Sequence, residues 1–322
     1  MRESGSPGSP SLEDVPRRGT VWARVVPVIL TVAIFLFIFW RIPFGAFWTA
    51  LAGARLLPFL GLMASFSLCF FLLDTFVLSR LIRWFHGPLR YRELLPVRAV
   101  TYLVSIINTQ LAQGALALYF NRRFRTPLVQ ISSTVALLIL LEATNLILFA
   151  TLGTIAFPGG APLILLALPV ALGTLWLLLM GLARGKLGVL GRRLSSSEIL
   201  ATFRRVRLSQ AAIILGLKGS VFCLALLVHS QALTFFGIEI PLTRLVTSLP
   251  VIFLVSALPI TVAHLGTSQA AWIFFFSRYA PEADLLAYSL ASHLTFMLAN
   301  GSFGVLFLPK AYRDLFLRER QG

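Results

Sequence analysis

The chain has 322 residues, of which 57% are hydrophobic and 12% are charged, and its mean hydropathy is +0.86. Soluble domains carry about 25% charged residues, so a water-soluble fold could not cover this much apolar surface. A backbone that crosses lipid must satisfy its own hydrogen bonds, as helices do, and the ~10-residue alternating segments of a β-barrel do not occur in the sequence. We therefore expect an all-α polytopic membrane protein.

The net charge of +16 does not indicate nucleic-acid binding. The arginines lie in short loops between apolar stretches, where basic residues hold loops on the cytoplasmic face and meet anionic lipid. Cys69 and Cys223 lie inside apolar runs without disulfide or metal-site spacing. We therefore expect membrane lipids as partners and neither nucleic acid, metal nor cofactor.

In chain order, residues 1–20 form a Ser-, Pro- and Gly-rich tail of the composition typical of disorder. Two later stretches, 99–120 and 241–276, are apolar but interrupted by polar residues, proline or glycine, and residues 311–322 form a second tail. Six further stretches are long and apolar enough to cross a bilayer: Val21–Trp40, Pro58–Leu78, Pro127–Phe157, Leu163–Leu182, Ser209–Phe236 and Leu285–Pro309.

The positions of the basic residues favour re-entrant paths for both interrupted stretches. If both stretches cross, many basic loop residues lie opposite the N-terminal tail, against the positive-inside bias. If each enters and returns on one side, 23 of the 28 Lys and Arg residues share a side. That side is then cytoplasmic and holds both termini. Two membrane halves, 21–157 and 158–310, would enter from opposite sides, as in the inverted repeats of many transporters.

Ionisable side chains inside a bilayer are costly and are functional candidates by default. Glu142 and Lys218 lie within apolar stretches, and a pair between them would neutralise both charges. Such a pair serves either a functional role or only the joining of two helices. Asp74 lies near the end of its stretch, so we expect it to pair at the interface with Arg80 and Arg83.

The two interrupted stretches place polar groups at membrane depth. Broken backbone is tolerated there only where it lines a cavity or is covered by protein, and free helix N–H groups suit an anion. Arginines just beyond the first stretch could hold a lipid phosphate, although they could also only set the topology. The residues that carry this interpretation are Asn108, Gln113, Arg122 and Arg123 in the first stretch and Pro259, His264, Gly266 and Gln269 in the second.

Two segments resemble the lysylphosphatidylglycerol synthase transmembrane-domain family, also called flippase-like domain proteins. They are INTQLAQGALALYFNRRFRTP, at 107–127, and LPVIFLVSALPITVAHLGTSQAA, at 249–271, and the similarity extends from about Arg24 to Pro309. In the larger synthases this membrane region is thought to move a modified phospholipid between leaflets, while a separate soluble domain attaches the amino acid. This sequence lacks that domain, so the resemblance implies lipid handling without aminoacylation. The chain departs from the family at His264, where glycine is expected, and at Gln269, where an acid is common.

The leading hypothesis is a flippase-like protein of the plasma (inner) membrane. It would bind an anionic or phosphorylated lipid between its halves and move the head group across. The first set of residues above would contact the head group from the cytoplasmic side, and the second set from the outer side. Glu142 and Lys218 would couple the halves or bind the head group.

Two alternatives remain open. The chain could be a non-catalytic membrane subunit or scaffold of a lipid or glycan assembly system, or an intramembrane lipid transferase. No HExxH, GxSxG or P-loop motif is present in the sequence, so we expect no enzyme activity. A homo-oligomer or a lipid-biosynthesis partner is compatible with either role.

Overall fold

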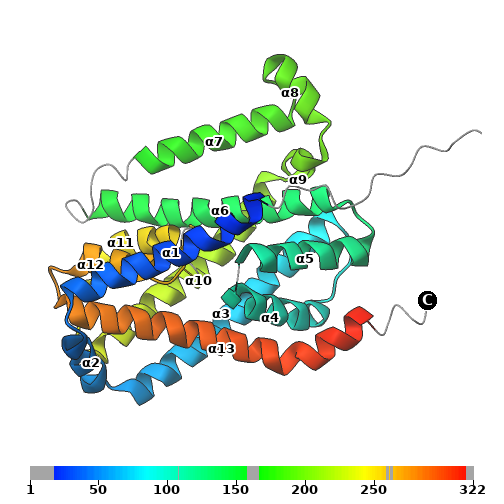
Figure 1. The fold of residues 1–322 in the computed structure, drawn as a ribbon. Coiled ribbons are helices and arrows are strands. Elements are labelled where there is room, and N and C mark those ends of the chain that lie inside the picture. Colours follow the sequence, from blue (N-terminus) through cyan, green and yellow to red (C-terminus); the bar gives the residue numbers. More distant parts are fainter. Residues whose placement is uncertain (1–17, 108, 158–166, 259–260, 262–263, 317–322) are drawn as a thin grey trace, which may run out of the picture.

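The computed structural model describes residues 18–107, 109–157, 167–258, 261 and 264–316, and within these ranges every regular element is a helix (Figure 1). Residues 1–17 of the first tail and 317–322 of the second lie outside the described residues, and residues 311–316 continue α13. The elements are α1 (Arg18–Arg41), α2 (Phe44–Gly53), α3 (Leu56–Phe85), α4 (Tyr91–Ile107), α5 (Thr109–Phe124), α6 (Leu128–Ala156), α7 (Ala167–Ala183), α8 (Gly188–Ser195), the 3-10 helix η2 (Glu198–Leu200), α9 (Ala201–Arg205), α10 (Leu208–Thr234), α11 (Leu242–Ser256), α12 (Thr267–Phe276) and α13 (Glu282–Phe316).

Four helices are long and apolar enough to cross a bilayer: α3, α6, α10 and the Glu282–Lys310 part of α13. A fifth span requires the Val28–Arg41 part of α1 to be joined to α2, and the chain bends by 86° between them. Pro43 precedes α2 at this bend, where it restricts the residue before it. The described chain therefore does not reach the six spans expected from the sequence. Of the stretch expected at Leu163–Leu182, the described residues lie in the 17-residue α7.

Each interrupted stretch forms a pair of helices. The first pair is α4 and α5 and the second is α11 and α12, and the members of each pair pack on one another. The first pair starts at Tyr91, earlier than the sequence indicated, and α4 and α11 each contain an internal proline, Pro96 and Pro250. In the second stretch, α11 ends at Ser256 and α12 starts at Thr267, so the described helices stop where irregular backbone was predicted; in the first stretch, Thr109–Gly114 are helical, within α5, so that part of the prediction was wrong.

The loops rich in arginine gather at one end of the bundle. Figure 1 places the α3–α4, α5–α6 and α7–α10 connections there, together with the last turns of α13. The opposite end carries the α1–α2 bend and the α10–α11 and α12–α13 connections (Figure 1). The arginine-rich end is called the basic end below.

Helices at equivalent positions in the two halves of the chain make equivalent contacts. Helix α4 packs on α13 as α11 packs on α6, and α5 packs on α6 as α12 packs on α13. Helix α3 packs on α13 as α10 packs on α6, while α3 and α10 pack on each other. The second half therefore reproduces the packing of the first.

Glycines allow the equivalent helix pairs of the two halves to approach closely. A Cβ added at Gly304 of α13 would lie 2.6 Å from the Cβ of Leu103 and 2.7 Å from the backbone oxygen of Ala99, both on α4. At Gly153 of α6, a Cβ would lie 3.0 Å from the Cα of Thr247 on α11. Helices in lipid gain stability from such close packing, because burial from water contributes little there.

Candidate functional site

An ionisable residue separates two apolar clusters on each of three helices. On α3, Phe66 belongs to one cluster and Val77 to the other, and Asp74 lies between them. The same change of cluster occurs at Glu142 on α6 and at Lys218 on α10. The three helices therefore carry their charges at one level of the bundle.

The Asp74 carboxylate accepts four hydrogen bonds. Its Oδ2 accepts from Arg98 on α4, at 2.8 Å from Nε and 2.6 Å from Nη2, and from the Tyr102 hydroxyl at 2.7 Å. Its Oδ1 accepts from Nζ of Lys218 at 2.8 Å. The side chains of Asp74 and Lys218 are only 4% and 5% exposed, so protein encloses this ion pair. Three side chains therefore surround this buried carboxylate with hydrogen-bond donors.

Lys218 joins a second carboxylate to the cluster. Its Nζ lies 3.3 Å from Oε1 of Glu142, which confirms the expected pair. The Glu142 side chain is 47% exposed, against 5% for Lys218. Asp74, Arg98, Lys218 and Glu142 are called the charge network below. It holds two cations and two anions, so it is formally neutral.

The charge network lies well inside the bundle. At 1.5 Å per residue, Arg98 is about 10 Å from the start of α4, Lys218 about 15 Å from the start of α10, and Glu142 about 20 Å from the start of α6. All three helices start at the basic end (Figure 1). A hydrocarbon core is about 30 Å thick, so these charges lie at membrane depth if α6 and α10 span it.

Asp74 does not pair with Arg80 or Arg83, so that prediction was wrong. The Arg80 guanidinium lies over the Phe76 ring, 5.1 Å from its centroid, and Arg83 is exposed at the basic end. The partner is Arg98, because α4 begins before this residue and carries it into the bundle.

Sequence reasoning also missed Tyr102, whose ring lies 4.7 Å from the carbon centre of the Arg98 guanidinium. The two residues are four apart and therefore share one face of a helix. That spacing was the available signal, but it has meaning only once Arg98 is placed in a helix and not in a basic loop.

The residues predicted from the first interrupted stretch do not gather at the charge network. Asn108 lies outside the described residues. Gln113 is half-buried on α5, and Arg122 and Arg123 are exposed in the last turn of this helix, at the basic end. Arg123 donates from Nη2 to Oε2 of Glu93 at 3.2 Å.

In the second interrupted stretch, Pro259 lies outside the described residues. His264 and Gly266 have φ of 60° and 91°, in the left-handed region that favours glycine. Gln269 is buried, and its Oε1 accepts from the backbone N–H of Gly266 at 2.6 Å. These residues shape the break and cap the start of α12. Their predicted contacts with lipid remain predictions.

Two histidines form separate polar contacts. The Nδ1 of His229 on α10 lies 2.6 Å from the Tyr288 hydroxyl on α13. At the basic end, His86 Nε2 lies 2.7 Å from Oγ1 of Thr134, which ties the end of α3 to α6. Burial, and secondarily the Arg205 guanidinium, lowers the pKa of His86.

Comparisons with protein-family models, curated proteins and solved structures gave no match to this chain. The resemblance to the lysylphosphatidylglycerol synthase transmembrane-domain family is therefore neither supported nor opposed by them. The function rests on the residues of the chain itself.

Proposed function

We propose that this chain is a flippase-like membrane protein that binds a phosphorylated lipid and moves its head group between leaflets. The observation that carries this proposal is the charge network between two apolar clusters. Apolar residues of similar volume often stabilise a fold as well as a buried ion pair does, and charges in a bilayer are costly. Four charges from four helices therefore favour a role beyond joining helices.

Glu142 is the member of the charge network that a ligand can replace. Its contact with Lys218 is longer than that of Asp74, at 3.3 Å against 2.8 Å, and its side chain is half-exposed. A lipid phosphate in its place gives Lys218 a new anionic partner. Asp74 meanwhile continues to neutralise Arg98, so the exchange leaves no buried charge unpaired.

The repeated helix contacts support an inverted repeat as the framework for this movement. Two equivalent halves that enter the membrane from opposite sides can open a site between them to either leaflet by rocking or gating. The positive-inside bias assigns the basic end, with both termini, to the cytoplasmic face of the plasma membrane. We propose re-entrant paths for the α4–α5 and α11–α12 pairs.

Lipid movement in proteoliposomes tests the function. Purified protein is reconstituted with fluorescent analogues of anionic phospholipids and isoprenoid phosphates, and the fraction of dye quenched from outside is followed over time. Lys218→Met and Glu142→Gln are expected to slow the movement. Glu198→Gln, an exposed acid on η2, is the matched control and is expected to keep the wild-type rate. Movement no faster than in empty vesicles for every lipid would refute the proposal.

A membrane scaffold is the second candidate. One observation favours it, namely that each member of the charge network has a partner within the chain. A scaffold keeps its co-purifying partners when Lys218→Met and Glu142→Gln are introduced. Loss of lipid movement in Glu142→Gln, whose side chain is half-exposed, with an unchanged unfolding temperature decides for the flippase.

A further inference from the structure

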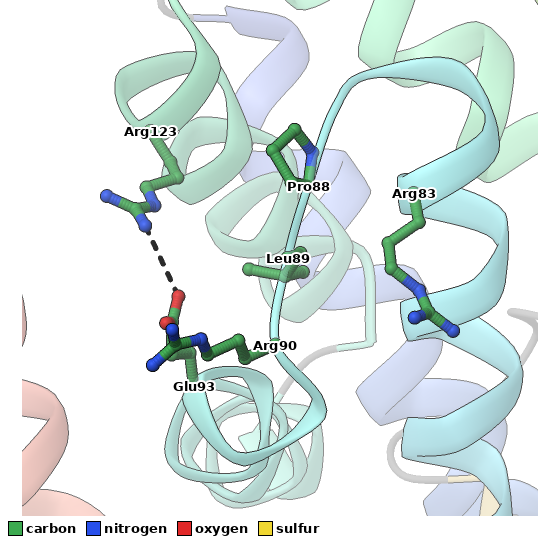
Figure 2. A pocket seen from close by; sticks show the side chains of 6 residues that line it. All are labelled: Arg83, Pro88, Leu89, Arg90, Glu93 and Arg123. Atoms are coloured by element: carbon green, nitrogen blue, oxygen red, sulfur yellow. Dashed lines mark hydrogen bonds and ion pairs between the residues drawn. The ribbon is translucent and has the colours of Figure 1, made fainter.

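A recess at the basic end gathers charged side chains from three elements (Figure 2). Arg83 comes from the last turn of α3, Arg90 from the residue before α4, and Arg123 from the last turn of α5. Pro88 and Leu89 form the wall, and Glu93 completes the lining. This group of six residues is called the arginine recess below.

The backbone of the arginine recess is fixed before any ligand binds. The Leu89 side chain is only 3% exposed and packs in the apolar cluster of the basic end. Gly87 has a φ of 143°, and a Cβ at this position would lie 3.4 Å from the Phe124 ring. The segment between α3 and α4 is therefore held against α5 and positions the arginines that flank it.

The charges within the recess are unbalanced. Three guanidinium groups face one carboxylate, that of Glu93. Figure 2 shows Arg90 and Arg123 on the same side of the Pro88–Leu89 segment as Glu93, and Arg83 on the other side. Two guanidiniums therefore adjoin the single carboxylate, while the third adds positive charge from across the segment.

The ion pair that occupies the recess is a weak one. Arg123 and Glu93 are 3.2 Å apart, and their side chains are 46% and 34% exposed. Exposed pairs of this kind contribute little to stability, because water and salt screen them. A ligand with more charge and more acceptor oxygens can therefore displace Glu93 from Arg123.

We propose that the arginine recess binds the phosphate monoester group of a lipid head group, which displaces Glu93 and is held between Arg90 and Arg123. A phosphate monoester carries a charge of about −1.5 to −2 and three acceptor oxygens, which suit two guanidinium forks, whereas a diester carries only one negative charge. The lipid source rests on the proposed function. Free inorganic phosphate has the same chemistry and is the alternative source.

Equilibrium binding to the purified full chain in a neutral detergent tests the inference, because it does not require lipid movement. The probes are dioctanoyl phosphatidic acid, dioctanoyl phosphatidylglycerol and inorganic phosphate, titrated by calorimetry. We expect phosphatidic acid to bind at least tenfold more tightly than the diester. The Arg90→Ala/Arg123→Ala double variant is expected to lose about tenfold or more of that affinity, since it removes charge-assisted hydrogen bonds.

Three further variants distinguish a specific binding site from general attraction to positive charge. Glu93→Gln removes the competing carboxylate and is expected to raise the affinity for phosphatidic acid severalfold. Arg90→Lys/Arg123→Lys keeps the charge but loses the forked geometry, so its affinity is expected to fall between those of the wild type and the alanine variant. Arg92→Ala removes an exposed arginine that does not line the recess, and its affinity is expected to stay within about twofold of wild type.

Equal weakening by Arg92→Ala and by the Arg90→Ala/Arg123→Ala variant overturns the site, as does equal binding of the monoester and the diester. Inorganic phosphate that binds as tightly as phosphatidic acid, with the same response to the variants, overturns the lipid source. Tight and selective binding of phosphatidic acid without lipid movement in proteoliposomes would instead contradict the proposed function alone.

Discussion

Replacing Asp74 by asparagine tests whether the charge network is balanced as the structure indicates. The substitution keeps the shape of the side chain but removes the anion that faces both Arg98 and Lys218. The only other anion of the network, Glu142, is half-exposed and contacts Lys218 alone. Removing one partner of a buried ion pair costs about 3–5 kcal/mol of unfolding free energy, so we expect a loss of this size.

The double variant Asp74→Asn/Lys218→Met sharpens the test. Lys218→Met alone leaves Asp74 paired with Arg98, so its loss is expected to be smaller than that of Asp74→Asn. In the double variant the methionine removes one of the two cations that lose the Asp74 carboxylate. Its loss should therefore fall short of the sum of the single losses by about 1–3 kcal/mol, the coupling found for residues in one network.

The assay is unfolding of the purified chain in detergent, followed by tryptophan fluorescence, with Glu198→Gln as the control for loss of an exposed acid. Additive losses would show that Asp74 and Lys218 do not act together. An Asp74→Asn loss no larger than that of the control would refute the balance of buried charge altogether.

Three further predictions concern the frame of the molecule. The pKa of His86 is lower in the folded chain than in the unfolded chain, so the unfolded chain binds the proton first as the pH falls. The free energy of unfolding is therefore expected to fall as the pH drops below about 6.5. In denaturant unfolding at pH 7.5 and 5.5, His86→Gln should flatten this dependence. Gly304→Ala is expected to lose about 1–3 kcal/mol of unfolding free energy, because its methyl group collides with α4. Gly216 has open space around it, so Gly216→Ala should be neutral or slightly stabilising. Equal effects of the two variants would contradict the close contact at Gly304. In a cysteine-free background, Arg122→Cys and Ser196→Cys should react with a membrane-impermeant thiol reagent from one side of the membrane, and Arg278→Cys from the other. Labelling of Arg122→Cys and Arg278→Cys from the same side would contradict the re-entrant path of α4 and α5.

The sequence allowed the helical class, the break between α11 and α12 and the Glu142–Lys218 pair to be predicted, because each follows from local composition. Apolar runs identify helices in lipid, and a polar run with glycine or proline identifies irregular backbone. Glu142 and Lys218 stood out because each is an isolated charge in an apolar run. The six-span count failed because α7 has only 17 residues and because the chain bends by 86° between α1 and α2, and composition reveals neither feature.

The rest of the charge network could not be predicted because it depends on distant segments. Asp74 lies 24 residues from Arg98 and 144 from Lys218 along the chain. Its nearest basic residues in sequence, Arg80 and Arg83, are not its partners. In the sequence, Arg98 looks like another arginine of a basic loop, because the sequence does not show that the first turns of α4 enter the bundle.

Helix α4 connects the arginine recess to the charge network, and its packing allows the two to act in sequence. Glu93 lies in the first turn of α4, and Arg98 lies five residues further on, about 7.5 Å along the axis. Pro96 lies between them and has no backbone N–H to donate, so the first turn can bend without the rest of the helix. The close contact of Gly304 with Leu103 fixes that remaining part against α13.

Displacing Glu93 from Arg123 therefore releases the first turn of α4 while Asp74 and Arg98 stay paired. In the proposed function, a phosphate can occupy the recess before it reaches the level of Lys218, where it replaces Glu142. The two carboxylates that a lipid phosphate would displace in this proposal, Glu93 and Glu142, are both partly exposed, at 34% and 47%, whereas Asp74 is 4% exposed. We therefore propose that the exposed acids are the exchangeable partners of the cations and that the buried acid holds the helices together during the exchange.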